Sequence, residues 1–178
     1  AINTRLVGSE MCIRDSLSTS QHVFKTIQKD VDAKKPSKSL NTCNNFDEIA
    51  DYIGNISQEK SQSDGISINT HLGSNFIVGG QIEGQEPELK MIYPVGNHIN
   101  VSEIKPFFQL GEIKYGKPIL DRLIRKEISL GDAARCALVS FDSTMKSDLS
   151  VGPPIDLVIY KKDTLDISQN DRLQFKTP

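Results

Sequence analysis

The first part of the chain carries two segments in which apolar residues recur with the period of an α-helix. Residues 18–33 (STSQHVFKTIQKDVDA) place four apolar residues on one helical face: Val23, Phe24, Ile27 and Val31. Residues 44–60 repeat the pattern with Phe46, Ile49, Ile53 and Ile56. Hydroxyl side chains can cap the first helix, which should end before Pro36, and Asn45 is a favourable cap for the second. We therefore predict two amphipathic helices joined by a polar loop.

The pattern then changes to β-rich runs. Residues 74–82 (SNFIVGGQI) and 87–95 (PELKMIYPV) are separated by EGQE, whose glycine suits a tight connection, so they predict a hairpin. The HINV and FFQLG segments predict two more short strands. Gly79 and Gly80 lie inside the first run, where a glycine pair indicates a bulge or a backbone pressed close to another group. Four strands after two helices predict a mostly antiparallel sheet with helices on one face.

Helical spacing returns in the last third. KYGKPILDRLI carries an apolar stripe and tolerates Pro118 in its first turn. SLGDAARCALVSFDSTM begins with Ser129 as a cap. We expect this second helix to bury Ala133, Ala134, Ala137, Leu138 and Phe141 in a flat layered packing. IDLVIY, residues 155–160, is a β-branched strand, and at most one further strand follows it.

Composition and charge restrict the class of protein. At 178 residues, with 37% hydrophobic and 25% charged residues, the chain has the size and composition of one globular domain. A net charge of −2 argues against nucleic-acid binding, which depends on clustered cations. The basic residues that do gather in short runs are Arg122, Arg125, Lys126, Lys161 and Lys162. We expect them to form solvated faces.

Cysteine and histidine offer no metal or disulfide pattern. Cys12, Cys43 and Cys136 are odd in number and contain no C-x-x-C pair, which favours a reducing cytoplasm. We expect Cys136 to be a buried small hydrophobe rather than a nucleophile. The histidines, read as surface or loop imidazoles, are His22, His71 and His98. No apolar run approaches the roughly twenty residues that cross a bilayer, so we expect no membrane contact. We also expect no metal, because the histidines and cysteines have no metal-ligand spacing. We expect no cofactor.

Residues 1–16, AINTRLVGSEMCIRDS, differ in character from the rest of the chain. They have neither helical nor strand periodicity, and they resemble translated adapter DNA found at the ends of unrelated sequences. We therefore interpret them as a non-native, disordered scar and residues 17–178 as the domain. On this hypothesis the native sequence begins near Leu17.

Three stretches together carry a family resemblance. They are FIVGGQIEGQEPELKMIYPVGN, FFQLGEIKYGKPILDRLI and ALVSFDSTMKSDLSVGPPIDLVIY. Across roughly Leu17 to Asp163 the chain resembles the bacterial proteasome-related proteases called Anbu, within the N-terminal-nucleophile hydrolases. The resemblance implies an α+β fold, a four-layer αββα sandwich, which in this chain would be incomplete and lack its first strands.

The resemblance also implies a threonine protease mechanism. In the family the mature chain begins with a threonine whose hydroxyl attacks a peptide carbonyl, assisted by its own α-amino group, an acid and a lysine. An α-amino group has a pKa of about 8, close enough to neutral to act as a base. Neither Ala1 nor Thr4 can be assigned that role, and Asp15 and Ser16 stand where the family has its oxyanion-hole glycine. We expect this polypeptide to be inactive, whatever the full-length protein does.

The site residues implied by the resemblance are supporting ones. Asp148 takes the position of the aspartate that supports the terminal amine and nucleophile. Val151 stands where ordinary proteasome subunits have a serine, and Ser150 could substitute for it. Gly111 stands where they have another supporting serine, and Gly79 and Gly80 are candidates to border the substrate groove.

Five other polar residues surround the end of the last helix: Ser140, Asp142, Ser143, Thr144 and Ser147. For these five we favour a simpler interpretation, in which they bond helix carbonyls or face water.

The implied partners are a peptide or unfolded protein substrate and further copies of the same chain, with the exposed faces of PILDRLIRKE as a contact. An alternative from another class is a non-catalytic ring or assembly scaffold with the same fold. A different amidohydrolase is a third alternative, because a fold does not specify a substrate. The first hypothesis requires a threonine-led segment ahead of Leu17, and the scaffold hypothesis does not.

Overall fold

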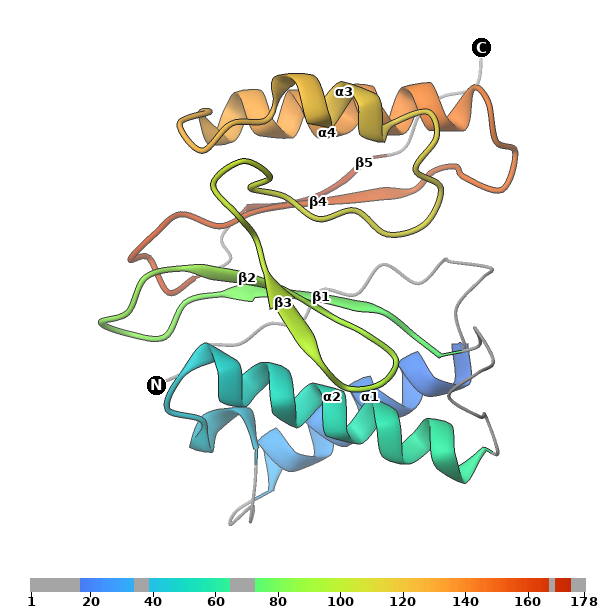
Figure 1. Cartoon of the computed structure of the whole chain (residues 1–178). Coiled ribbons are helices and arrows are strands. Elements are labelled where there is room, and N and C mark those ends of the chain that lie inside the picture. Colours follow the sequence, from blue (N-terminus) through green and yellow to red (C-terminus); the bar gives the residue numbers. More distant parts are fainter. Residues whose placement is uncertain (1–16, 34–38, 65–72, 167–168, 174–178) are drawn as a thin grey trace. The chain divides into compact units, whose positions relative to one another are not determined.

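The computed structural model describes residues 17–33, 39–64, 73–166 and 169–173, and it divides the chain into two compact units. Unit 1 comprises residues 1–100 and unit 2 comprises residues 101–178 (Figure 1). Each unit combines helices with an antiparallel sheet, so the fold belongs to the α+β class. The non-native interpretation of residues 1–16 falls outside the described residues.

The helices of unit 1 form where the apolar spacing predicts them. They are α1 (Leu17–Asp32) and α2 (Phe46–Ser63), joined through a short 3₁₀ turn, η1 (Leu40–Thr42). The Asn45 side chain accepts a hydrogen bond of 2.9 Å from the backbone N–H of Glu48 and so caps α2. Both helix predictions are confirmed, including the cap and the end of α1 before Pro36.

The sheet of unit 1 has three antiparallel strands in the order β1-β2-β3. These strands are β1 (Phe76–Gly80), β2 (Glu88–Ile92) and β3 (His98–Asn100). The predicted hairpin is confirmed, and Gly84 in its connection has a φ of +79°, a conformation that favours glycine. HINV also yields a strand, as predicted.

The glycine pair of β1 marks close packing and not a bulge. Gly79 pairs with Leu89 and Gly80 with Glu88 in an unbroken ladder. A Cβ added at Gly80 would lie 3.6 Å from the Phe46 ring of α2, and one at Gly79 would lie 2.9 Å from the Leu89 side chain. Of the two alternatives that the sequence left open, the structure shows the close approach.

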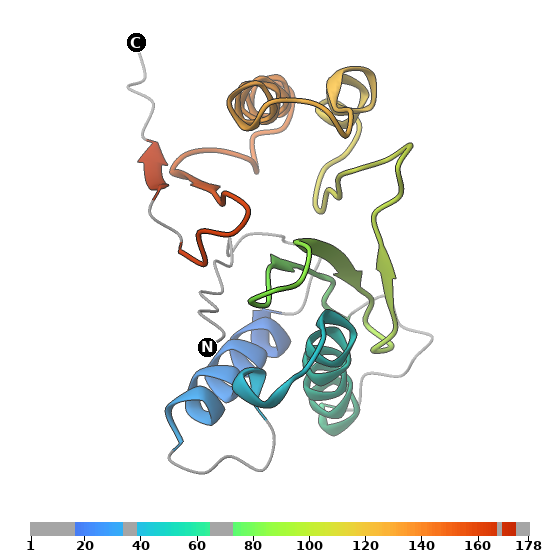
Figure 2. The same ribbon diagram turned by 90° about the vertical axis from the view of Figure 1, so that its left-hand side faces the viewer.

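The core of unit 1 lies between its helices and one face of its sheet. Figures 1 and 2 show α1 and α2 side by side beneath β1–β3. The buried residues that form one cluster there are Val23, Ile27, Leu40, Cys43, Phe46, Ile49, Ala50, Tyr52, Ile53, Ile56, Val78 and Ile92. Removing this apolar surface from water is the main stabilising contribution in unit 1.

Unit 2 places two helices beside each other, and the second of them contacts one strand of a two-stranded sheet (Figure 2). The helices are α3 (Lys117–Leu123) and α4 (Leu130–Met145). The strands are β4 (Ile155–Ile159) and β5 (Gln169–Leu173), paired antiparallel. These elements confirm both helix predictions, the 155–160 strand and the single further strand after it.

The cap of α4 is also confirmed. The Ser129 hydroxyl accepts a hydrogen bond of 3.1 Å from the backbone N–H of Asp132. Pro118 lies in the first turn of α3, where its missing N–H would have no helical partner.

Two predictions in unit 2 are wrong. FFQLG (107–111) pairs with no strand among the described residues; Pro106 beside it lacks a backbone donor, and Gly111 leaves extended geometry with a φ of +86°. The α4 residues expected to be buried are only half-buried, and Phe141 is 45% exposed. The two strands of this sheet cover less of α4 than the flat layer that the apolar stripe predicts.

The surface of the described residues matches one simpler expectation. The basic residues of the two short runs are exposed, as predicted for solvated faces. Within the described ranges, no helix is both long enough and apolar enough to cross a lipid bilayer.

Candidate functional site

The predicted supporting residues Asp148 and Ser150 lie in one turn directly after α4. The backbone N–H of Asp148 donates to the carbonyl of Thr144 at 2.8 Å, which closes the helix. Three residues later, the N–H of Val151 donates to the carbonyl of Asp148 at 3.1 Å. The chain therefore reverses at residues 148–151 in a hydrogen-bonded turn.

The side chains of this turn hold each other in place. One carboxylate oxygen of Asp148 accepts from the Ser150 N–H at 2.9 Å and from the Ser150 hydroxyl at 2.7 Å. Aspartates commonly fix turns through hydrogen bonds of this kind, and the two bonds also orient the carboxylate. Asp148 is half-buried and Ser150 is exposed, while Leu149 at the tip is fully exposed. A fixed carboxylate of this kind can accept hydrogen bonds from an amine or a hydroxyl.

Some of the five neighbouring polar residues bond helix carbonyls or face water, as predicted. The others take part in the packing between α3 and α4. The Thr144 hydroxyl donates to the Ser140 carbonyl at 2.9 Å, and Asp142 pairs with Lys146 in water, as expected. Ser147 is exposed. The hydroxyl of Ser143 instead donates across to the Tyr115 carbonyl at 3.3 Å.

Ser140 belongs to the same packing contact between α3 and α4. It is buried, and a Cβ at Gly116 would collide with its hydroxyl and lie 2.9 Å from both its carbonyl and the Thr144 hydroxyl. Gly116 therefore lets the start of α3 approach α4 closely. The glycine in the KYGKP motif was the available signal for this contact, which sequence reasoning did not identify.

The remaining predicted positions belong to different units. Gly111 lies in unit 2, in the loop before α3, and its positive φ explains a glycine there, because a serine would be strained. Gly79 and Gly80 lie in β1 of unit 1. Their assignment to a substrate groove stays a prediction.

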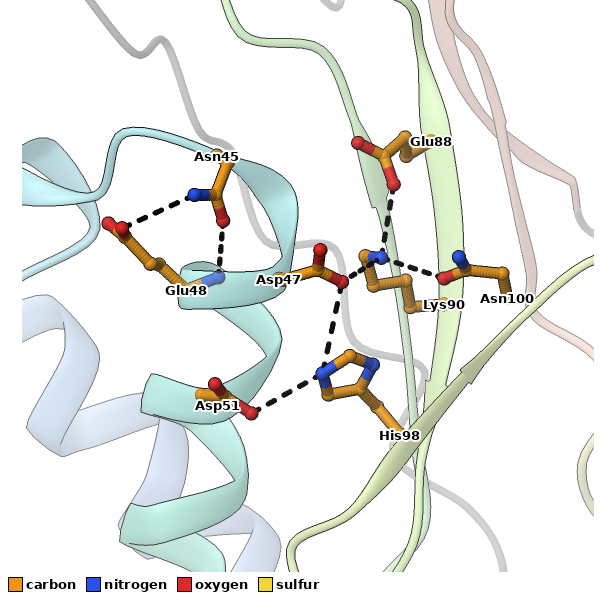
Figure 3. Close-up of polar contacts among 8 residues, drawn as sticks. All are labelled: Asn45, Asp47, Glu48, Asp51, Glu88, Lys90, His98 and Asn100. Atoms are coloured by element: carbon orange, nitrogen blue, oxygen red, sulfur yellow. Dashed lines mark hydrogen bonds and ion pairs between the residues drawn. The ribbon is translucent and has the colours of Figure 1, made fainter.

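Unit 1 contains a polar cluster that sequence reasoning missed, centred on Lys90 of β2 (Figure 3). The side chain of Lys90 is fully buried. Its Nζ lies 2.6 Å from an Asp47 carboxylate oxygen, 2.7 Å from the Asn100 amide oxygen and 3.0 Å from a Glu88 carboxylate oxygen. Three acceptors from α2, β3 and β2 thus satisfy the three protons of the ammonium group. This arrangement, here called the Lys90 cluster, joins three elements of unit 1.

The electrostatics of the Lys90 cluster favour the charged pair. Burial alone would lower the pKa of Lys90, but hydrogen bonds from the ammonium to Asp47 and Glu88 outweigh it and raise that pKa above its ordinary value of 10.5. The same hydrogen bond, with the charge of Lys90, lowers the pKa of Asp47 below 3.8. Both groups therefore remain ionised at neutral pH.

His98 extends the cluster and corrects a prediction. It lies half-buried on β3, rather than in a loop, with Nε2 3.3 Å from Asp51 and 4.0 Å from Asp47 (Figure 3). His22 is exposed, as predicted, and His71 lies outside the described residues.

The alternation of residues along β2 indicates in the sequence itself that Lys90 faces the core. This lysine lies two positions from Ile92 on β2, and alternate residues of a strand share a face, so its side chain points to the buried face. The sequence did not say which acceptors would meet it, because Asp47 is 43 positions away.

A second, partly buried polar contact joins α1 to α2. The Tyr52 hydroxyl donates to an Asp30 carboxylate oxygen at 2.5 Å. Burial, followed by this hydrogen bond to an anion, raises the pKa of Tyr52 well above its ordinary value of 10.

The described residues contain no group of three or more histidine, cysteine, aspartate and glutamate side chains arranged to hold a metal ion. Cys43 is buried in the core of unit 1. Cys136 is half-buried on α4, so it is less enclosed than expected.

Solved structures from three bacteria resemble this chain. The Gly-1 mutant of Anbu from Hyphomicrobium sp. strain MC1 is 44% identical, with a TM-score of 0.80, over 88% of this chain and 64% of that one. Anbu from Yersinia bercovieri, described as an ancestral beta-subunit, is 38% identical, with a TM-score of 0.82, over 89% and 65%. Anbu from Pseudomonas aeruginosa, solved as a helical assembly of the Anbu complex, is 43% identical, with a TM-score of 0.79, over 88% and 65%.

A further structure of the Hyphomicrobium protein is matched over 92% of this chain and 70% of that one, at 38% identity and a TM-score of 0.72. No protein-family model matches the chain, and no curated protein does. The similarities place the chain in the class of proteasome-like subunits with an α+β fold. Within that class, the chain belongs to the Anbu family. It spans 64% and 65% of the length of the first two relatives.

Proposed function

We propose that this chain is part of a proteasome-like threonine peptidase subunit and supplies supporting residues to its active site. The observation that carries the proposal is the turn in which Asp148 and Ser150 are fixed by two hydrogen bonds to one carboxylate oxygen. Membership in the Anbu family supports it. The substrate class is peptide or unfolded protein, and the setting is the cytoplasm.

In this proposal Asp148 positions the terminal amine and hydroxyl of the nucleophilic threonine, and the Ser150 hydroxyl takes the place of the serine absent at Val151. Gly79, Gly80 and Gly111 border the substrate. The threonine, its acid and its lysine belong to sequence beyond these 178 residues. This chain by itself should therefore not hydrolyse peptides.

We also propose a four-layer sandwich for the whole subunit. In unit 1 the register places Ile77, Met91 and Ile99 in one row across the three strands. This row lies on the face opposite the helices, because its residues alternate with Val78, Lys90 and Ile92. Ile77 and Ile99 remain exposed at 37% and 42%. An apolar row of this kind supports a second sheet packed on that face.

The test begins with the source DNA upstream of the codon for Leu17. If it encodes a threonine-led segment, the extended protein should hydrolyse fluorogenic peptide amides, and replacing that threonine by alanine should abolish the activity. Asp148→Asn should lower kcat/KM about 100-fold, because a misplaced nucleophile loses near-attack geometry. Asp142→Asn, an exposed carboxylate on α4, is the matched control and should leave kcat/KM unchanged.

Each outcome has a distinct meaning. Activity that depends on the threonine but not on Asp148 would contradict the site assignment and keep the peptidase. An extended protein that is folded, carries the threonine and cleaves no peptide would favour a non-catalytic scaffold subunit.

Self-association is the second part of the proposal. The Pseudomonas aeruginosa relative was solved as a helical assembly. We propose that this chain also associates with copies of itself, and sedimentation equilibrium at increasing protein concentration tests it.

A further inference from the structure

Thr144, in the last turn of α4, holds the turn that carries Asp148. Its carbonyl accepts the backbone N–H of Ser147 at 3.0 Å and the backbone N–H of Asp148 at 2.8 Å. Helices commonly end with their last carbonyls bonded in this way, and such bonds fix the direction in which the chain leaves the helix. The placement of residues 148–151 therefore depends on the placement of the Thr144 carbonyl.

The side chain of Thr144 is itself enclosed. The residue is only 5% exposed, although threonine lies mostly at protein surfaces. Its hydroxyl donates to the Ser140 carbonyl at 2.9 Å. Gly116 lies against it, because a Cβ added at this glycine would be 2.9 Å from the same hydroxyl. Thr144 is thus held between its own helix and the start of α3.

The start of α3 is also hydrogen-bonded to this turn of α4. The Ser143 hydroxyl donates to the Tyr115 carbonyl at 3.3 Å. Tyr115 belongs to the segment that leads from Gly111 into α3. The loop before α3 and the turn after α4 carry the two predicted supporting positions of unit 2. These contacts join them.

We propose that Thr144 is a positioning residue for Asp148, because its buried hydroxyl fixes the carbonyl to which the supporting turn is bonded. Residues that touch a reacting group need neighbours that hold them by packing and hydrogen bonds. The bond to Ser140 and the contact with Gly116 supply both for the last turn of α4. The inference deepens the proposed function and rests on it for its consequence in catalysis. The positioning of the turn can be measured without peptide hydrolysis.

A packing role alone makes a different prediction for the same position. If Thr144 only filled space between α3 and α4, valine would replace it best, because valine keeps the branched shape, and serine and alanine would leave cavities. If the hydroxyl positions the turn, serine should replace it best, because serine keeps the hydrogen bond. Valine and alanine should then both fail. The order of three substitutions therefore separates the two roles.

Hydrogen exchange of the full chain, resolved by NMR, gives this order. In Thr144→Val and Thr144→Ala the amide protons of Asp148 and Ser150 should exchange about tenfold faster, because a lost hydrogen bond eases local opening by about that factor. In Thr144→Ser they should stay within about twofold of the natural rates. Amide protons in the middle of α4 should keep their natural rates in all three variants, because the opening is confined to the end of the helix.

The matched control is Thr164→Val, in the connection after β4. This exposed hydroxyl also donates to a backbone carbonyl, that of Lys161 at 2.7 Å, so the control removes the same kind of hydrogen bond elsewhere in unit 2. It should leave exchange at Asp148 and Ser150 unchanged. Thr144→Ala removes the hydroxyl without adding a methyl group at its place, which keeps the test valid if valine destabilises unit 2.

The exchange rates can overturn the inference. A natural rate in the turn of Thr144→Val together with faster exchange in Thr144→Ser would assign the residue to packing. Natural rates in all three variants would show that the hydroxyl does not hold the turn. Exchange that rises equally along the whole of α4 would show a general loss of stability instead of positioning.

Kinetics of the extended protein, with its threonine, test the consequence for catalysis. Thr144→Val should lower kcat about tenfold and leave KM unchanged, because a displaced supporting carboxylate affects the reacting groups and not the binding of substrate. Thr144→Ser should restore kcat. Faster exchange in the turn with an unchanged kcat would support the positioning of Asp148 and contradict the function proposed for it. The two failures are therefore distinguishable.

Discussion

The two units of the chain differ in how completely they bury their apolar side chains. Unit 1 encloses one cluster between two helices and a sheet, with Ile49 and Ile92 at 1% and 0% exposure. Among the described residues of unit 2, the buried hydrophobic side chains are Ile124 and Ile155, while Ile104 and Leu149 are 86% and 102% exposed. Both units have regular helices and paired strands, so the difference lies in packing and not in secondary structure.

This difference indicates which unit depends on further contacts. Apolar surface left in water contributes nothing to folding, so unit 2 gains less from its own packing than unit 1 does. It also offers more surface to other layers or other copies. The supporting turn of the proposed site lies in unit 2, the less enclosed of the two.

The largest contrast should come from equivalent truncations in the two units. Ile53→Ala in the core of unit 1 should lower the free energy of unfolding by about 4 kcal/mol, because it leaves a cavity among buried neighbours. Leu138→Ala on half-buried α4 should cost about 1 kcal/mol. Native-state hydrogen exchange read by mass spectrometry reports each unit separately. Equal losses would show that the two units are equally packed.

Lys90 should have the next largest effect. Lys90→Ala should lower the stability of unit 1 by about 3 kcal/mol, since it removes a fully buried side chain with three polar partners. Lys90→Met keeps most of the volume, and the exposed Asp47 carboxylate returns to water, so we expect about 1 kcal/mol. Urea denaturation of both variants measures the difference. If methionine is as harmful as alanine, the ion pair matters more than the packing.

Two glycines of unit 2, Gly116 and Gly131, should respond oppositely to the same substitution. Gly116→Ala should lower stability by about 2 kcal/mol, because the new Cβ collides with Ser140. Gly131→Ala, at a helical position with no atom within 4 Å of the added Cβ, should instead raise stability by about 0.5 kcal/mol. Thermal melts of the two variants give the sign. A neutral Gly116→Ala would mean that α3 is loosely held.

The pH dependence of unit 1 should follow the Lys90 cluster. Because the pKa of Asp47 is lowered in the folded state, its contribution is present above pH 3.8 and is lost as the pH falls further. Because the pKa of Lys90 is raised, its contribution is present below pH 10.5 and is lost as the pH rises beyond that value. Melting temperatures from about pH 3 to about pH 11 should therefore fall less steeply at both ends in Lys90→Met. Parallel curves for the two proteins would contradict this assignment.

The smallest expected effect has the opposite sign. The Ser57 hydroxyl on α2 is buried without a hydrogen-bond partner among the described atoms. Ser57→Ala removes that cost and improves helix propensity, so it should raise stability by about 1 kcal/mol. Ser63→Ala, which removes an exposed hydroxyl bonded to the Lys60 carbonyl, is the control and should change stability by less. A loss of stability in Ser57→Ala would point to an ordered water bound to the hydroxyl.

Sequence reasoning predicted the helices and strands of both units better than the contacts and the burial of their side chains. Asn45 and Ser129 were identified as caps because capping depends on residues three apart. A turn was expected after α4 and lies at residues 148–151, but only the structure shows that Asp148 bonds Ser150. The burial of Lys90 and the contact at Gly116 were missed, since each depends on residues distant in the chain. FFQLG had strand propensity without a partner strand among the described residues.

Helix faces, caps and the hairpin of this chain follow from its residue order, because they rest on contacts within about four positions or across one tight turn. The folded arrangement settles which inward residues become buried, which glycines are crowded and which charges meet. Those outcomes depend on side chains brought together from separate elements, whose identity no local pattern contains. The enclosed core of unit 1 and the close contact at Gly116 in unit 2 are both of this second kind.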